Sequence, residues 1–104
     1  MIYSCRMFEV IESEAFKRWR RGLKDRRALM RIHARIGRIA EGNLGDVKLV
    51  GDGISELRID YGPGYRLYFM RRGLVMIVLL AGGDKRTQKA DIDRAATIAK
   101  EWGD

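Results

Sequence analysis

The sequence predicts an α+β domain in which helices pack on a mostly antiparallel sheet. Two observations predict this class. Apolar residues recur with helical spacing over residues 13–42, and they follow the spacing of strands over residues 47–81 before a last helical pattern closes the chain. A length of 104 residues favours one domain, so residues 1–104 are expected to fold as a single unit.

The N-terminal part is expected to form one strand and a helical hairpin. Apolar residues partly alternate over residues 6–12, which is typical of a strand. Ser13 is the expected N-cap of a short helix that ends near Gly22. Asp25 is the expected N-cap of a longer helix that ends at Gly42. The apolar faces of the two helices are formed by Phe16, Trp19 and Leu23 and by Leu29, Ile32, Ile36 and Ile39.

The rest of the chain is expected to form a β-meander and a C-terminal helix. The four strands are predicted at residues 47–50, 54–60, 65–70 and 74–81. The last strand is apolar throughout, so it should be central in the sheet and covered on both faces. The helix is expected to begin at Asp84 or Thr87. Its apolar side is formed by Ile92, Ala95, Ala96, Ala99 and Trp102.

The chain has 21 Lys and Arg residues and 14 Asp and Glu residues, a formal net charge of +7. Residues 1–40 contain 11 basic and 4 acidic residues, whereas residues 41–104 contain 10 of each, so the whole excess lies in the N-terminal part. This charge indicates a polyanion such as RNA or DNA, or an acidic protein, as partner. A solvated helix face is the alternative explanation. One stripe of the longer helix contains Arg27, Arg31, Arg35 and Arg38.

Two rare residue types limit the possible chemistry. Cys5 and His33 are the only cysteine and histidine, which excludes an internal disulfide, a multi-cysteine zinc site and a cluster of histidine ligands. No metal and no cofactor are therefore expected. The longest apolar run has eight residues and the N-terminus lacks the apolar core of a signal peptide, so a cytoplasmic protein without membrane contact is expected.

The first candidate site follows the turn Gly62-Pro63-Gly64, on a strand where Arg66 and Tyr68 share a face. An arginine there can bind a phosphate through its bidentate guanidinium, and a neighbouring tyrosine can stack on a base or donate a proton. The structural alternative is that Arg66 forms a cross-strand ion pair with Glu56 or Asp60 and that the tyrosines are half-buried on the sheet.

The second candidate site is the segment Gly82-Gly83-Asp84-Lys85-Arg86, which leads from the apolar strand into the last helix. Glycines let a backbone approach a ligand, and a helix N-terminus adds positive potential to that of Lys85 and Arg86. The segment is therefore a candidate phosphate cradle. The alternative is a strand-to-helix turn that Asp84 caps, but two cations directly after the aspartate favour the phosphate cradle.

Ordered motifs along nearly the whole chain are similar to those of one protein family. They are Phe16-x-x-Trp19, Leu23-Lys24-Asp25, Glu41-Gly42-Asn43-Leu44-Gly45-Asp46, Glu56-Leu57-Arg58-Ile59, Gly62-Pro63-Gly64-Tyr65-Arg66-x-Tyr68-Phe69 and Gly82-Gly83-Asp84-Lys85-x-Thr87-Gln88-x-x-Asp91-Ile92. As a set they resemble the phage-derived Gp49-like, HigB-type addiction module killer proteins of the RelE/ParE toxin superfamily. The resemblance implies a RelE-like fold and a type II toxin that a cognate helix-turn-helix antitoxin neutralises.

The resemblance also implies an activity. The RelE and HigB branch cuts mRNA on the translating ribosome by attack of the RNA 2′-hydroxyl on the adjacent phosphorus, whereas the ParE branch poisons DNA gyrase. Arg66, Lys85 and Arg86 match the positions of phosphate-stabilising cations, and together with Tyr68 they are the expected catalytic residues. Contacts with RNA or the ribosome are expected from Lys48, Arg58, Tyr65, Arg27, Arg31 and Arg35.

The sequence departs from the RelE nucleases at their acid and base positions. Those enzymes have lysines where this chain has Ile54 and Glu56, and a tyrosine near the position of Ile92. The residues that could substitute for them are Tyr68, Tyr65, Asp84 and Lys48. Two other functions stay open, a non-catalytic inhibitor of DNA gyrase and a non-toxic nucleic-acid-binding module.

Overall fold

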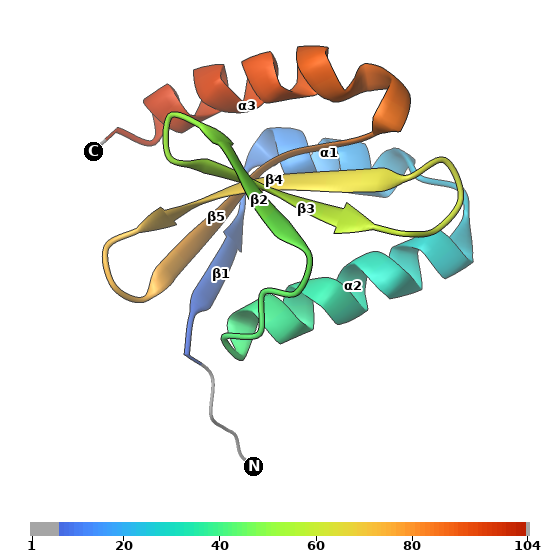
Figure 1. The fold of residues 1–104 in the computed structure, drawn as a ribbon, viewed down its shortest axis with the longest axis horizontal. Helices are drawn as coiled ribbons and strands as arrows, with labels where there is room; N and C mark the ends of the chain where they lie inside the picture. Colours follow the sequence, from blue (N-terminus) through green and yellow to red (C-terminus); the bar gives the residue numbers. More distant parts are fainter. Residues whose placement is uncertain (1–6, 104) are drawn as a thin grey trace.

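The computed structural model describes residues 7–103, which form a five-stranded mixed sheet with helices on both faces (Figure 1). The elements are β1 (Glu9–Glu12), α1 (Glu14–Gly22), α2 (Arg26–Ala40), β2 (Val47–Gly51), β3 (Ile54–Ile59), β4 (Tyr65–Arg72), β5 (Met76–Asp84), the 3₁₀ turn η1 (Lys85–Thr87) and α3 (Gln88–Glu101). The expected α+β class is confirmed. Arg6, where the first strand was expected to begin, lies outside the described residues.

The strand order in the sheet is β1-β5-β4-β3-β2. Strands β2 to β5 form the expected antiparallel meander, and β1 pairs in parallel with β5, with Val10 opposite Ile77. The prediction of a mostly antiparallel sheet is therefore confirmed. Because β5 lies between β1 and β4 and is covered on both faces, its residues Ile77 to Ala81 are buried.

The two helices of the N-terminal hairpin begin at the residues that the sequence predicts. The side chain of Ser13 accepts a hydrogen bond from the Phe16 backbone N–H over 3.1 Å, and Asp25 accepts one from the Ala28 backbone N–H over 3.2 Å. Helix α2 ends at Ala40, and Gly42 just beyond it has a φ of +90°.

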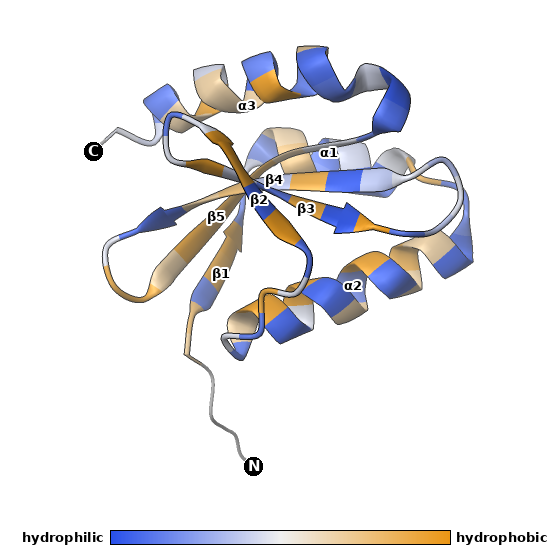
Figure 2. Ribbon diagram, viewed as in Figure 1, coloured by the Kyte–Doolittle hydropathy of each residue, from blue (hydrophilic) through white to orange (hydrophobic). Residues whose placement is uncertain are grey.

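Each face of the sheet carries its own hydrophobic cluster. Helices α1 and α2 pack on one face around Phe16, Ile32 and Leu67, and α3 packs on the other around Tyr68 and Ala95. Figure 2 shows that hydrophobic and hydrophilic residues alternate along α2, in agreement with one buried and one exposed face. The expected packing of the hairpin and of a C-terminal helix on the sheet is confirmed. In the described part of the chain, no helix has both the length and the apolar character needed to cross a membrane.

Strand β5 begins later than the sequence predicts. It starts at Met76 rather than at residue 74, because Leu74 and Val75 belong to the turn that follows β4. Their exposed fractions are 86% and 60%, so an apolar run did not mean burial at these two positions. A turn at the end of a hairpin projects beyond both helical layers, whatever the hydropathy of its residues.

Strand β5 also ends later than predicted, at Asp84, so Gly82 and Gly83 are strand residues and not parts of a ligand-binding loop. Both pair with β4, Gly83 opposite Arg66. A Cβ atom on Gly82 would collide with the Trp19 ring, and one on Gly83 would collide with the Asp91 carboxylate. The glycines therefore allow close packing within the protein, which is the physical reason for their presence here.

Candidate anion-binding cleft

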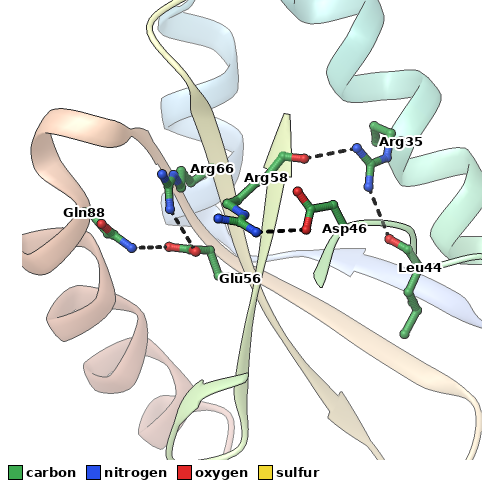
Figure 3. A network of polar contacts seen from close by, with 7 residues as sticks. All are labelled: Arg35, Leu44, Asp46, Glu56, Arg58, Arg66 and Gln88. Carbon is green, nitrogen blue, oxygen red and sulfur yellow. Dashed lines mark hydrogen bonds and ion pairs between the residues drawn. The ribbon is translucent and has the colours of Figure 1, made fainter. Parts of the chain in front are cut away.

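Two arginines lie next to each other on the face of the sheet that α3 covers. Arg58 on β3 and Arg66 on β4 are directly opposite in the antiparallel ladder, so their side chains leave the sheet on the same face. A carboxylate offsets each guanidinium (Figure 3): Arg66 Nη1 donates to Glu56 Oε1 over 2.9 Å, and Arg58 Nη2 donates to Asp46 Oδ1 over 3.1 Å. The two strands thus carry two ion pairs side by side, each with one guanidinium and one carboxylate.

Glu56 is a buried carboxylate with three hydrogen-bond donors. Its exposed fraction is 1%, and besides Arg66 it accepts bonds from the Tyr68 hydroxyl over 3.1 Å and from Gln88 Nε2 over 2.8 Å. A buried carboxylate requires such partners, because an unpaired charge in the protein interior is very unfavourable. Of the two interpretations of Arg66, the cross-strand ion pair is the one present, with Glu56 and not Asp60 as partner.

Tyr68 does not fit the expected direct catalytic role. Its exposed fraction is 0%, and its hydroxyl is occupied by Glu56. Burial, and then the charge of Glu56, raise the pKa of Tyr68 well above the usual value of a tyrosine. Tyr68 therefore supports Glu56 from inside the core and does not reach a ligand. The sequence predicts its strand face correctly but does not reveal that α3 covers it.

An open cleft of about 390 Å³ lies above the two arginines. Its cationic side chains are Arg58, Arg66 and Lys85, and its carboxylates are Asp46 and Asp60. The other lining residues are Ile59, Gly64 and Tyr65. The cleft thus joins residues from β3, β4, η1 and the loop before β2, and its cations are placed to bind an anion such as a phosphate.

Lys85 reaches the cleft because the start of β4 and the end of β5 are paired, with Tyr65 opposite Asp84. Gly64, in the turn before β4, has a φ of +81°, a conformation that favours glycine, and a Cβ atom there would be in ordinary contact with the Lys85 Cβ at 3.5 Å. The pairing of the two strands therefore brings Lys85 into the same cleft as Arg66. The sequence predicts both cations, and the sheet register brings them together.

Arg86 and the expected phosphate cradle do not belong to this cleft. Arg86, whose side chain is 84% exposed, lies 3.7 Å from Asp84 and is not among the lining residues. Asp84 occupies the N-terminal end of η1, since its side chain accepts a bond from the Arg86 backbone N–H over 2.9 Å. Asp91, buried against Thr87 and Arg94, adds a second carboxylate near the start of α3. The segment is a capped turn, and carboxylates stand where the cradle would hold a phosphate.

Arg35, expected to contact RNA, serves the fold. Its guanidinium donates to the backbone oxygen of Arg58 over 3.1 Å and to that of Leu44 over 3.2 Å (Figure 3). Gly45 lies close to this guanidinium, which leaves no space for a side chain. Arg35 therefore connects α2 to β3 and to the loop that carries Asp46, and it indirectly supports one wall of the cleft.

The N-terminal end of α2 lies near the rim of the cleft. The Arg31 guanidinium lies 4.7 Å from the centre of the Tyr61 ring, and the Tyr61 hydroxyl donates to Asp25 over 3.1 Å. Partial burial, and then this hydrogen bond, raise the pKa of Tyr61. Arg27 is exposed one turn before Arg31. Arg31 thus packs on the residue that follows the cleft residue Asp60, and Arg27 adds an exposed positive charge on the same helix.

Lys48 and Tyr65 occupy different positions relative to the cleft. Lys48 is opposite Glu56 on the edge strand β2 and is exposed, but it does not line the cleft. Tyr65 lines it and packs its ring edge-on against Trp19 at 6.3 Å between centroids. Partial burial, and then the charges of Asp25 and Asp84, raise the pKa of Tyr65, so its hydroxyl is protonated at neutral pH.

Sequence reasoning assigned no role to Gln88, Tyr61 or Asp46. Gln88 belongs to one of the motifs of the family resemblance. Its contact with Glu56, which lies 32 residues earlier, leaves no trace in the local sequence pattern. His33 lies on α2 and does not line the cleft. Among residues 7–103, no group of three or more His, Cys, Asp and Glu side chains is placed to hold a metal ion.

No protein-family model matches the chain. It is 51% identical over 88 residues to an uncharacterized protein of Haemophilus influenzae, and the match covers 85% of this chain and 89% of that protein.

Proposed function

The chain belongs to the same family as the Haemophilus influenzae protein, and we propose that it is the toxin of a type II toxin–antitoxin module that cuts mRNA on the ribosome. The observation that carries the proposal is the open cleft with Arg58, Arg66 and Lys85 on its walls. The motif resemblance to HigB-type toxins supports it. The arrangement of the elements, with a helical hairpin on one face of a meander and a C-terminal helix on the other, is compatible with the RelE-like fold that this resemblance implies.

The cleft suits a phosphodiester. Arg58 and Arg66 repel each other across the ladder, so an anion bound between them would be favourable for both. A guanidinium presents a fork of N–H donors that matches two phosphate oxygens, and Lys85 adds a mobile point charge. These groups can stabilise the extra negative charge of a pentavalent phosphorus, which is the main requirement for cleavage of RNA by its own 2′-hydroxyl.

The proposed reaction forms a bond from the 2′-oxygen to phosphorus and breaks the bond from phosphorus to the 5′-oxygen. A base removes the 2′-hydroxyl proton, and an acid gives a proton to the leaving 5′-oxygen. Asp60 lines the cleft, is exposed and has no ion pair within the described residues, so it is the candidate base. Lys85 and the protonated Tyr65 are the candidate proton donors.

The proposed partners follow from the charge distribution. Exposed arginines on α2, with the cleft cations beside them, would contact ribosomal RNA and mRNA. A helix-turn-helix antitoxin would neutralise the toxin by presenting carboxylates to the same surface, and association would be fast and sensitive to salt because the chain carries +7.

The test is to induce the protein in growing cells and map mRNA 5′ ends during growth arrest. Lys85→Ala and Arg58→Ala remove cleft cations, and Lys100→Ala is a matched control because Lys100 is exposed at the far end of α3. New mRNA ends are expected with the native protein and the control and are expected to decrease with both cleft variants. Intact transcripts in growth-arrested cells would refute the nuclease proposal.

One observation favours a second candidate, inhibition of DNA gyrase without catalysis. The sequence suggests Tyr68 as a proton donor, but this residue is buried, so the cleft has fewer acid–base groups than expected. A supercoiling assay with purified gyrase distinguishes the two functions, because only the second predicts inhibition there. A non-toxic nucleic-acid-binding module would cause no growth arrest at all.

A further inference from the structure

We propose that Glu56 is the positioning residue of the cleft, a buried carboxylate that holds the Arg66 guanidinium in the one orientation that presents its free N–H groups to a phosphate. The inference deepens the proposed function and rests on it, since the phosphate is that of the RNA substrate. It assigns a role to a carboxylate at a position where the RelE nucleases have a lysine.

The contact between Glu56 and Arg66 leaves most of the guanidinium available. Among the described residues, Arg66 has one hydrogen-bond acceptor, Glu56 Oε1 at 2.9 Å from its Nη1. A guanidinium has five N–H donors, so the others can bind an anion. The Arg66 side chain is 12% exposed and lines the cleft, so the cleft is the side from which an anion can reach it.

Glu56 is itself held in place by two further hydrogen bonds. Its second oxygen, Oε2, accepts bonds from the Tyr68 hydroxyl in the core and from Gln88 at the first position of α3. Both donors belong to packed elements, and Glu56 is 1% exposed. Removal of Glu56 from these donors would leave a buried charge unpaired, so the position of Oε1 is fixed.

A fixed acceptor restricts a flexible side chain. Arginine has several rotatable bonds, and holding it before the substrate arrives avoids an entropic cost during the reaction. Preorganised donors also stabilise a developing charge better than donors that must reorient. The negative charge of Glu56 lowers the attraction of Arg66 for a phosphate in the ground state, so we expect Glu56 to favour turnover and not substrate affinity.

The first test is cleavage of ribosome-bound mRNA in a purified translation system, with the kinetic parameters kcat and KM measured separately. Glu56→Gln keeps the shape but places an amide against three donors, and we expect kcat to fall about 100-fold without an increase in KM. Glu101→Gln, the same change at the exposed end of α3, is the matched control and should keep both parameters. A rise in KM with unchanged kcat would overturn the proposal.

A second variant covers the case in which Glu56→Gln does not fold. Gln88→Ala removes one donor to Glu56 from a half-buried position at the start of α3, and its kcat should fall about tenfold. Unchanged kcat in Gln88→Ala, with a structure that keeps its melting temperature, would contradict the positioning role.

Chemical rescue separates positioning from a general structural role. Arg66→Ala opens a space beside Glu56 that free guanidinium ion can enter, so millimolar guanidinium should restore part of the cleavage by Arg66→Ala and none by the Arg66→Ala/Glu56→Gln double variant. Equal rescue of both variants would show that Glu56 does not orient the group.

A last measurement does not depend on RNA cleavage, so it distinguishes failure of this inference from failure of the proposed function. In nitrogen-15 NMR spectra of the native protein, the Nη–H signals of Arg66 should show slow rotation and slow exchange, and in Glu56→Gln they should not. If the native protein cuts no mRNA but this signal behaves as stated, the nuclease proposal fails and the fixed arginine stands. A freely rotating Arg66 in the native protein overturns the inference.

Discussion

The two ion pairs of the cleft have similar lengths but different surroundings. Arg66 and Glu56 are 2.9 Å apart, with side chains 12% and 1% exposed, whereas Arg58 and Asp46 are 3.1 Å apart with side chains 46% and 59% exposed. The first pair is largely buried and tied to the core through Glu56, and the second is hydrated. Length alone therefore does not indicate which interaction is strong.

The difference has a functional meaning. In a hydrated pair the net attraction is small, so Arg58 can exchange Asp46 for a phosphate at little cost. In the buried pair, separation of the charges would leave Glu56 without its partner, so Arg66 keeps its place. In the proposed function, the cleft thus combines one arginine that is fixed before the RNA arrives with one that can adjust to it.

Truncation of the carboxylate should destabilise the protein strongly at the buried pair and only weakly at the exposed pair. Glu56→Ala leaves Arg66 beside a cavity without its counter-charge, and the free energy of unfolding should fall by about 3–5 kcal/mol. Asp46→Ala, the matched change in the exposed pair, should cost about 1 kcal/mol or less. Urea denaturation followed by circular dichroism measures both. Equal losses for the two variants would remove the distinction between the pairs.

A smaller loss of stability is expected from a substitution at Gly82, the β5 residue before Gly83, which pairs with Arg66. Gly82→Ala would force a Cβ atom into the Trp19 ring and should lower the free energy of unfolding by about 1–3 kcal/mol. Gly37→Ala is the control, because open space surrounds a Cβ there and alanine is the better helix former. Thermal unfolding measures both changes. A neutral Gly82→Ala would mean that Trp19 can move away from β5 freely.

Binding of single-stranded RNA should reveal the exchangeable arginine. Arg58→Ala should weaken binding of an oligoribonucleotide and reduce the slope of log affinity against log salt by about 0.7, which corresponds to one lost phosphate contact. Lys100→Ala should leave the slope unchanged, since Lys100 lies outside the cleft. Fluorescence anisotropy over a range of salt concentrations measures the slope. An unchanged slope in Arg58→Ala would place the RNA elsewhere.

The buried pair should also influence the titration of Tyr68, whose hydroxyl donates to Glu56. The pKa of Tyr68 is raised by burial and then by Glu56, so Glu56→Gln should lower it, whereas Asp46→Asn should not. Since the folded pKa exceeds the unfolded one, the resulting stability is present below the usual tyrosine pKa of about 10 and is lost as pH rises through the folded value. Carbon-13 NMR of the tyrosine rings reports the titration. An unaltered pKa in Glu56→Gln would argue against the close contact.

Local signals predict much of this fold. Ser13 and Asp25 are identified as caps from short-range patterns, and the alternation over β3 and β4 places Arg66 and Tyr68 on one face. These features depend on neighbours along the chain or on the next strand. They therefore require no knowledge of how the helices pack.

Tertiary packing decides what the sequence does not reveal. Tyr68 and Glu56 are covered by α3, and the donor Gln88 comes from that helix. Gly82 and Gly83 look like loop residues until Trp19 and Asp91 are placed against them. A candidate site inferred from strand faces alone therefore includes Tyr68, which is buried, and omits Gln88, which donates to Glu56.

The proposal that the cleft between β3, β4 and η1 cuts mRNA calls for one decisive experiment. Cleavage of ribosome-bound mRNA is mapped in a purified translation system with the native protein, Lys85→Ala and Lys100→Ala. If the cleft cuts mRNA as proposed, new mRNA ends are expected with the native protein and Lys100→Ala, and far fewer with Lys85→Ala. Equal cleavage by Lys85→Ala and the native protein, or no cleavage by either, would contradict it.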